Sequence, residues 1–302
     1  MKKLAAFDLV TLGYLAIISL IVVAVRPPGA WVFLALHAAA ALWVGMIIAA
    51  HGRYGGPFWT FFRYWYVLPF VLCAFREIHY LVPLVHPFDD RHFDRVLQAL
   101  DRRWFGDVDA FFLSNWPPPL VDLLHLCYWF YYVALLIPGG ILFARADWGR
   151  LREFLSVTML ALLTSYLGYF AVPAVGPHLF LNPRPPALDG WFLGGAMHRM
   201  VMAAELTMPD AFPSGHALMS LVVIALTWRL YRPAFRWVVV PSLGCVLATI
   251  ALRYHYVVDV VASVALFPVV VVAGVALHRR WEARGAGGPE TRTPAAPTSS
   301  LP

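Results

Sequence analysis

The chain has 302 residues, of which 61% are hydrophobic and 13% are charged, and it carries a formal net charge of +6. A soluble domain has about 25% charged residues and lacks long uninterrupted apolar runs, so this composition excludes an ordinary soluble protein. The arginines lie mostly in short loops between apolar runs, where they act as topology signals and contact lipid headgroups, which argues against a nucleic-acid partner.

Apolar runs close to the ~20 residues of a spanning helix recur along the whole chain. They predict an all-α, polytopic transmembrane helical bundle of about eight spans, at residues 7–25, 31–50, 58–75, 120–143, 154–173, 216–230, 237–252 and 256–277. The third run contains Arg63, and the sixth is short enough to need tilt or a locally thinner bilayer.

These runs divide the chain into four parts. We expect N-terminal transmembrane helices at 1–75, an extracytoplasmic amphipathic segment at 76–119, a second transmembrane bundle carrying the motifs at 120–280, and a disordered cytoplasmic tail at 281–302. Within the second part, the stretch 92–104 places apolar residues at helical spacing: Phe93, Val96, Leu97 and Leu100. This spacing predicts an amphipathic helix on the outer surface.

The distribution of basic residues predicts the orientation in the membrane. With the N-terminus inside, the inner segments carry an excess of basic residues such as Lys2, Arg145 and Arg232. The opposite segments balance their arginines with acids, among them Asp94 and Asp101. The bias predicts a multi-pass protein of the cell (plasma or inner) membrane, with both termini cytoplasmic and the motif residues facing the outside or the periplasm.

His255 is followed one helical turn later by Asp259. Residues at i and i+4 share a helix face, so the carboxylate can accept from one ring nitrogen and leave the other as a nucleophile or base. The plainer alternative is a polar pair that satisfies itself near a helix end. Ionisable pairs at membrane depth are costly and are usually functional, which favours the first interpretation.

His216 ends the stretch Pro213-Ser214-Gly215-His216 and precedes His255 by 39 positions. Two apolar runs fill the interval, so a helical hairpin returns both imidazoles to the same membrane face. Ser214 suits an N-cap, and the amides of the helix start form an anion site. Alone, this stretch is a helix-start turn with an interface histidine; paired with His255 it predicts a reaction centre.

Two arginines complete the candidate site: Arg253, two residues before His255, and Arg184, in the long outer loop 174–215. A guanidinium can donate two hydrogen bonds at once to phosphate oxygens, whereas the alternative for each arginine is snorkelling to a headgroup. Two histidines, arginines and helix-end amides together suit in-line attack on a phosphate ester. We expect neither a metal nor a cofactor, because no compact set of ligands is visible.

These residues resemble motifs of the type 2 phosphatidic acid phosphatase superfamily, the lipid phosphate phosphatases. Its second motif, Pro-Ser-Gly-His, matches residues 213–216, and the end of its third, His-x3-Asp, matches His255 and Asp259. The Ser-Arg that usually opens the third motif is replaced by Ala248-Thr249. The upstream threonine and the His255-Tyr256 pair resemble the inositol phosphorylceramide synthase branch. The segment 94–106 also looks like that branch. Of the first motif only Arg184-Pro185 is present, with His178 after Gly176-Pro177.

The resemblance implies a role for each matched residue. The third-motif histidine, His255, becomes a phosphohistidine held by Asp259, and His216 protonates the leaving alkoxide. Ser214 and Gly215 bind phosphoryl oxygens, as do Arg253, Arg184 and His178. The residue types therefore predict an enzyme that acts on a lipid-linked phosphate among membrane lipids. Whether water or an alcohol such as inositol accepts the phosphorylated group stays open, as does the oligomeric state.

Three other classes of protein fit parts of the pattern. A transporter would use the polar residues as a relay, although transport sites tend to lie at mid-membrane. An intramembrane serine protease would use Ser214, but Phe212 stands where a rhomboid-like Gly-x-Ser-Gly pattern has its first glycine. A metal hydrolase would use the histidines as ligands.

Overall fold

The structure is a computed structural model, which describes residues 4–86, 92–108, 111–112, 116–181, 184–205 and 209–285. All regular elements within these ranges are helical, which confirms the all-α prediction. Seven apolar stretches of the described residues are long enough to cross a membrane: α1 (Ala6–Val25), α2 (Ala30–Tyr54), α3 with α4 (Gly56–Trp65, Val67–Val85), α7 with α8 (Pro118–Ala134, Leu136–Ala144), α9 (Trp148–Ala171), α13 (Arg232–Ala251) and α14 (Val257–Gly285).

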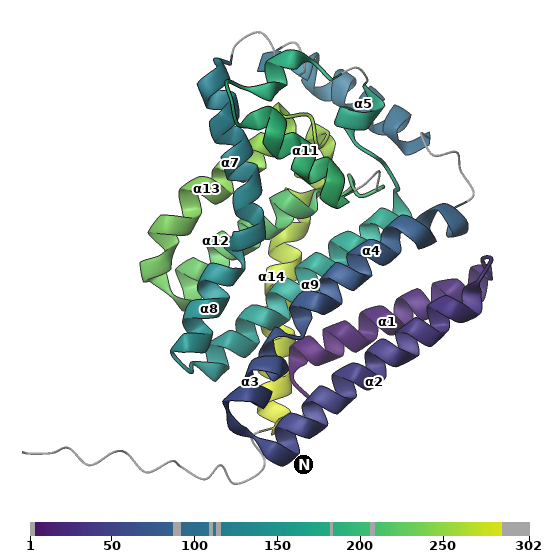
Figure 1. The fold of residues 1–302 in the computed structure, drawn as a ribbon, viewed down its shortest axis with the longest axis vertical. Helices are drawn as coiled ribbons and strands as arrows, with labels where there is room; N and C mark the ends of the chain where they lie inside the picture. Colours follow the sequence, from purple (N-terminus) through teal and green to yellow (C-terminus); the bar gives the residue numbers. More distant parts are fainter. Residues whose placement is uncertain are drawn as a thin grey trace, which may run out of the picture.

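The expected sixth span forms α12 (Gly215–Leu230), which has 16 residues. At 1.5 Å per residue it is about 24 Å long, shorter than a hydrocarbon core of about 30 Å. Length alone therefore does not qualify it as a span. It nevertheless pairs with α13 as the expected hairpin (Figure 1).

Two of the expected spans are broken helices, and prolines explain both breaks. Pro69 and Pro138 have no N–H for the carbonyls four residues earlier, and the preceding helices end at Trp65 and Ala134. The third span was expected at 58–75, but α4 continues to Val85. The boundary expected at residue 75 therefore falls inside a helix.

Arg63 is held inside the bundle by an ion pair. It is 6% exposed, and its Nη1 and Nη2 lie 3.0 and 2.5 Å from the two carboxylate oxygens of Asp8 on α1. The hydroxyl of Tyr66 donates to the same carboxylate at 2.6 Å. Paired and hydrogen-bonded in this way, a charge is tolerated at membrane depth.

Helix α14 extends five residues, 281–285, into the region expected to be a disordered tail. Arg152 of α9 donates to both carboxylate oxygens of Glu282, at 3.1 and 3.0 Å, and the indole N–H of Trp281 donates to the carbonyl of Leu4. These contacts hold the helix end. The rest of the expected tail, 286–302, and the basic residues Lys2 and Lys3 lie outside the described residues.

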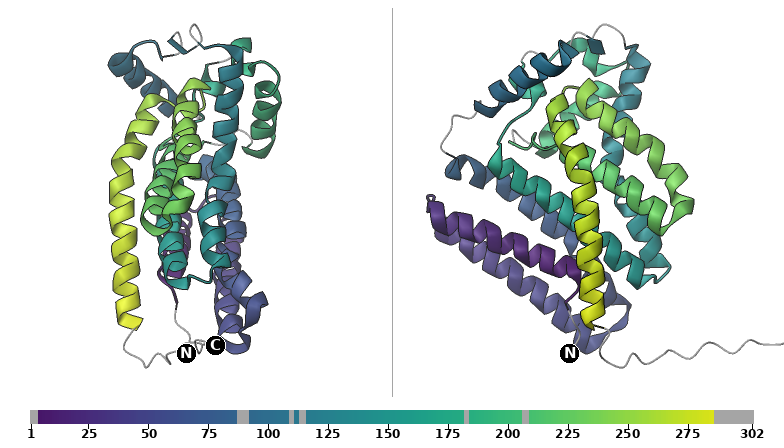
Figure 2. Two further views of the ribbon diagram at one scale, coloured as in Figure 1. Left: turned by 90° about the vertical axis from the view of Figure 1, so that its left-hand side faces the viewer. Right: turned by 180° about the vertical axis from the view of Figure 1, so that it is seen from behind.

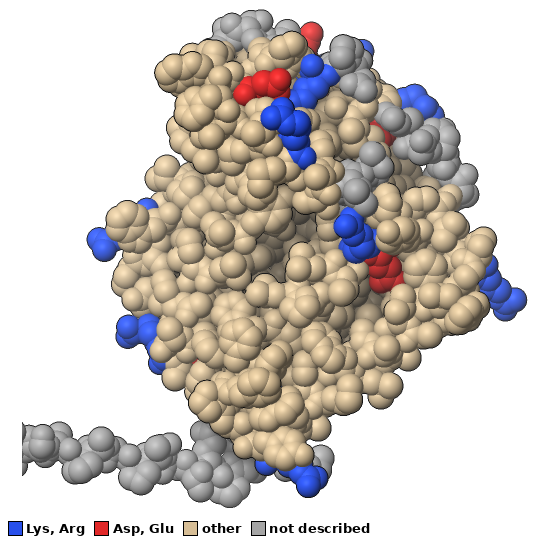
Figure 3. All heavy atoms as spheres, viewed as in Figure 1, with Lys and Arg blue, Asp and Glu red and all other residues tan. Residues whose placement is uncertain are grey.

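Helix α9 lies at the centre of the bundle (Figure 1). In its apolar stretch of 18 residues, 72% of the residues are buried. The hairpin of α1 and α2 flanks it on one side, and α12 packs against it on another. Figure 3 shows that uncharged side chains cover most of one face, with charged residues mainly along its upper part and edges. Such a surface suits a lipid environment.

The outer segments form a cap at one end of the bundle. The expected amphipathic helix is α5 (His92–Phe105), and the long loop contains α10 (Pro177–Phe180), the 3-10 turn η1 (Pro186–Asp189) and α11 (Gly194–Glu205). Figure 2 shows α5 and α11 at the end opposite to the start of α1 and the end of α14. The cap therefore covers the end where α12 begins and α13 ends.

Candidate active site

The α12–α13 hairpin brings the two histidines of the sequence motifs together. His216 is the second residue of α12, and His255 lies in the turn between α13 and α14. Their ring centroids are 5.9 Å apart and the ring planes meet at 55°. The spacing lets the two rings flank one small group.

The ring of His255 is fixed mainly by a backbone carbonyl. Nδ1 lies 2.8 Å from the carbonyl oxygen of Ala211 and 3.5 Å from Oδ2 of Asp259. A carbonyl oxygen only accepts, so Nδ1 carries the proton and Nε2 carries the lone pair. The expected carboxylate is thus the more distant partner. Its Oδ2 also accepts the backbone N–H of Tyr256, at 2.8 Å.

His216 packs within a wall of aromatic rings. Its ring stacks on Tyr128, with 4.4 Å between centroids and 22° between planes, and lies 4.1 Å from the ring of Tyr131. Tyr128 in turn stacks on Tyr254 at 4.3 Å. The aromatic wall restricts the rotation of the imidazole and keeps water from one of its faces.

Ser214 is the N-cap of α12, as predicted, and its Oγ accepts the N–H of Ala217 at 3.2 Å. Its own N–H donates to the carbonyl of Asp259 at 3.3 Å, and the side chain is fully buried. The residue therefore fixes the helix start to α14 instead of lining a pocket. Gly215 is sterically required, because a Cβ there would lie 2.5 Å from the hydroxyl oxygen of Tyr169.

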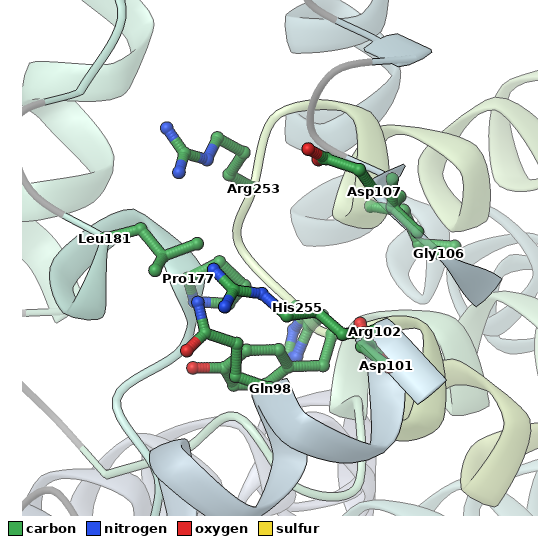
Figure 4. A pocket seen from close by; sticks show the side chains of 12 residues that line it. Gln98, Asp101, Arg102, Gly106, Asp107, Pro177, Leu181, Arg253 and His255 are labelled. Atoms are coloured by element: carbon green, nitrogen blue, oxygen red, sulfur yellow. The ribbon is translucent and has the colours of Figure 1, made fainter. Parts of the chain in front are cut away.

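A pocket of about 60 Å³ opens beside His255 (Figure 4). At about 10–15 Å³ for each water, it holds several waters or one phosphoryl group. Two arginines, Arg253 and Arg102, line it together with Gln98 of α5. Arg253 has a left-handed backbone with φ of 66°, a conformation that is uncommon for a side-chain-bearing residue and occurs at functional sites.

His255 and Arg253 line this pocket, whereas Arg184, His178 and His216 do not belong to its lining. The Nη2 of Arg184 donates to the carbonyl of Leu188 at 2.6 Å, and Asp189 lies 3.5 Å away. Its Nε and Nη1 are buried without a hydrogen-bond partner among the described residues. One nitrogen of the guanidinium is therefore held by its own loop, and the phosphate contact expected of Arg184 stays a prediction.

His178 and His198 both pack against Tyr254. The His178 ring lies 5.2 Å from the Tyr254 ring, and Nδ1 of His198 lies 2.8 Å from the Tyr254 hydroxyl. Burial, followed by the nearby charges of His198 and His255, lowers the pKa of His178 to about 3. Burial and Arg184 lower the pKa of His198 to about 4. Both rings are therefore neutral near pH 7.

Helix α5 supplies residues of the site that the sequence analysis missed. Arg102 and Gln98 line the pocket, while Asp94 and Asp101 bind backbone amides beside it. The spacing of Asp94 and Asp101 contains a signal for this role, because residues seven apart share a helix face. The prediction of an amphipathic helix rests on the apolar residues alone. Val96 of that set is 44% exposed, whereas Asp94 is fully buried.

The donor groups of the site do not form a metal-ligand set. Among the described residues no three His, Cys, Asp or Glu side chains are grouped closely enough to hold a metal ion. The metal-hydrolase alternative therefore has no set of ligands within these ranges.

Comparison with known proteins identifies a family. A search of curated proteins and a search of solved structures returned no match. The model of one protein family, described as the PAP2 superfamily, matches residues 95–273. This range covers more than half of the 302 residues and includes His216, His255 and Asp259. The chain belongs to the PAP2 superfamily.

Proposed function

We propose that this chain is an integral membrane phosphoesterase or phosphotransferase that acts on a lipid-linked phosphate ester through a phosphohistidine intermediate at His255. Membership of the PAP2 superfamily supports a phosphatase-type enzyme. The observation that carries the mechanism is the 5.9 Å separation of the His216 and His255 rings beside a pocket lined by Arg253.

The first step forms a bond between His255 and phosphorus. Nε2 of His255 attacks while the bond from phosphorus to the lipid oxygen breaks, and His216 gives that oxygen its proton. A reacting pair needs an approach of about 3–3.5 Å, which two rings flanking one phosphoryl group can provide. The aromatic wall behind His216 holds the acid in place, and proton donation of this kind contributes about 10²–10⁴-fold.

The second step restores the histidine. The oxygen of water or an alcohol attacks phosphorus and gives its proton to His216, while the phosphorus–nitrogen bond breaks and its electrons return to Nε2 of His255. Arg253 and Arg102 balance the charge on the phosphoryl oxygens in both steps through charge-assisted hydrogen bonds. These protein groups supply the proton transfers and the positive charge, so the proposal needs neither a metal nor a cofactor.

The proposal also concerns the acceptor of the phosphorylated group and the class of lipid substrate. We place the chain in a branch similar to inositol phosphorylceramide synthases, in which inositol replaces water as acceptor. The support is Ala248-Thr249 and the His255-Tyr256 pair, with the Thr249 carbonyl accepting the backbone N–H of His255 at 2.9 Å. Incubating purified protein with a labelled phospholipid, with and without inositol, separates transfer from hydrolysis.

We also propose that the site faces the outside or the periplasm and that both termini are cytoplasmic. The start of α1 and the end of α14 lie at the end of the molecule opposite to α5, which agrees with an even number of crossings (Figure 2). Arg145 follows the end of α8, and Arg150 and Arg152 lie near the start of α9. This basic cluster supports an inner location for the connection between the two helices.

Two substrates with different leaving groups test the assignment of His216 as the acid and His255 as the nucleophile. An aryl phosphate leaves without much protonation, whereas a lipid alkoxide needs a proton. We expect His216→Gln to lose about 10²–10⁴-fold in kcat on a lipid phosphate and most of this loss to disappear on an aryl phosphate. His255→Gln should lose both activities. Equal losses on both substrates in His216→Gln would contradict its role as the acid.

A further inference from the structure

Two carboxylates of α5 reach into the backbone around the candidate site. Asp94 is fully buried, and its oxygens accept the N–H groups of Val175 and Gly176, both at 3.0 Å. One of these oxygens also accepts the hydroxyl of Tyr256 at 3.0 Å. Burial and the charge of Asp94 raise the pKa of Tyr256, so the phenol remains a donor.

Asp101, two helical turns further along the same face, binds the first turn of α14. Its oxygens accept the N–H groups of Val257 and Val258 at 2.8 and 2.9 Å. The first amides of a helix have no partner within the helix, and a negative charge at that end is favourable. Here the partner comes from a helix more than 150 residues away in the sequence. The position of α14 is therefore coupled to that of α5.

Both contacts lead directly to His255. Val257 is two residues beyond His255, so Asp101 fixes the backbone that carries the imidazole. Val175 follows Ala174, whose carbonyl accepts the N–H of Ala211 at 2.9 Å. The carbonyl of Ala211 is the 2.8 Å partner of the His255 Nδ1. Asp94 thus acts on the ring through a short chain of hydrogen bonds.

We propose that Asp101 and Asp94 are positioning residues, through which α5 holds the backbone and the ring of His255 in the geometry needed for attack on phosphorus. The inference rests on the proposed function. Because α5 also contributes Arg102 to the pocket, the same helix sets the distance between an arginine and the nucleophile. Hydrogen bonds that involve a charged group are roughly twice as strong as neutral ones, which suits such a role.

The test compares Asp101→Asn and Asp101→Ala with Asp147→Asn in the full-length protein. Asp147 is a matched control, since it caps α9 by accepting the N–H of Arg150 at 3.3 Å, and it precedes a different spanning helix. A misplacement of about 1 Å costs about 10²-fold in rate. We expect kcat to fall about 10- to 100-fold in Asp101→Ala and less in Asp101→Asn, with KM within about twofold.

Asp147→Asn should keep the wild-type kcat. A kcat of Asp101→Ala within about twofold of wild type, a loss confined to KM, or an equal loss in Asp147→Asn would overturn the proposal. If Asp101→Ala does not fold, Tyr256→Phe removes only the hydroxyl that donates to Asp94, and its kcat should fall while KM holds. An unchanged kcat in Tyr256→Phe would then count against the role of Asp94.

A second readout separates this inference from the proposed function. Hydrogen exchange at the amides of Val257 and Val258 should quicken in Asp101→Asn and stay unchanged in Asp147→Asn. If wild-type protein forms no phosphohistidine, the proposed function is wrong, and the exchange result still tests the contact between Asp101 and the start of α14. If the intermediate forms at the wild-type rate in both Asp101 variants, the function stands and the positioning role is wrong.

Discussion

Gly168 of α9 sets the position of the Pro-Ser-Gly-His stretch, although it belongs to no motif. A Cβ at this residue would lie 2.2 Å from Cδ and 3.2 Å from Cγ of Pro213, and 3.3 Å from the carbonyl oxygen of Phe212. Carbon atoms in contact lie about 3.5–4.0 Å apart, so Gly168→Ala forces the proline ring to retreat by about 1 Å or more.

The displacement has two measurable consequences. Overpacking of this kind costs about 1–3 kcal/mol and alanine in place of glycine in a helix gains about 1 kcal/mol, so the net destabilisation is about 0–2 kcal/mol. Pro213 precedes the N-cap Ser214, so the shift carries His216 with it. A shift of about 1 Å lowers kcat by about 10²-fold.

The control lies in the same helix. A Cβ at Gly149 meets no atom within 4 Å, so Gly149→Ala should keep the wild-type kcat and be as stable as wild type or more so. The assay is turnover of a lipid phosphate in detergent, together with thermal unfolding of each variant. Equal activity and stability in Gly168→Ala and Gly149→Ala would refute the reasoning.

Three further predictions concern the buried charges and the pocket. Asp8→Asn leaves Arg63 buried without a countercharge, so we expect a loss of about 3–5 kcal/mol in unfolding free energy at unchanged kcat of the folded protein; a loss below about 1 kcal/mol contradicts the pair. The pKa of His178 is lowered from 6.5 to about 3 in the folded protein. The neutral ring therefore contributes its full stabilisation above pH 6.5, and this stabilisation is lost as the pH falls towards 3, by up to about 1.4 kcal/mol per pH unit. Melting temperatures at pH 7.5 and about pH 5 should differ more in wild type than in His178→Phe. Equal differences would show that His178 is not the source of the pH dependence of stability. Arg102→Gln should weaken inhibition by vanadate about tenfold, whereas Arg103→Gln, at a position that does not line this pocket, should not. Equal effects would remove Arg102 from the pocket.

The spans and the hairpin are readable from sequence because their signals are local. Hydropathy marks each run, prolines mark the breaks, and two adjacent runs return their ends to the same face. This reasoning places His216 beside His255 and Ser214 at a helix start. The same reasoning ended the third span at residue 75, although the α3–α4 pair continues to Val85. Arg63 and the proline break obscured the length of this pair.

The partners of the site residues are not readable in the same way. The main acceptor for His255 is the carbonyl of Ala211, and every residue type carries such a group, so no sequence signal marks it. The carboxylates of α5 bind amides 81 to 157 residues away, contacts that only the tertiary fold decides. Arg184 matched a motif, but its guanidinium is held by the Leu188 carbonyl of its own loop.

The most direct measurement traps the covalent intermediate. His216→Gln is mixed with an aryl phosphate, quenched within one turnover at alkaline pH, and digested for mapping of the phosphorylated peptide. The mechanism predicts an acid-labile phosphoryl group on Nε2 of His255 that is absent from His255→Gln. A phosphoryl group on another residue, or turnover without any covalent intermediate, would contradict it.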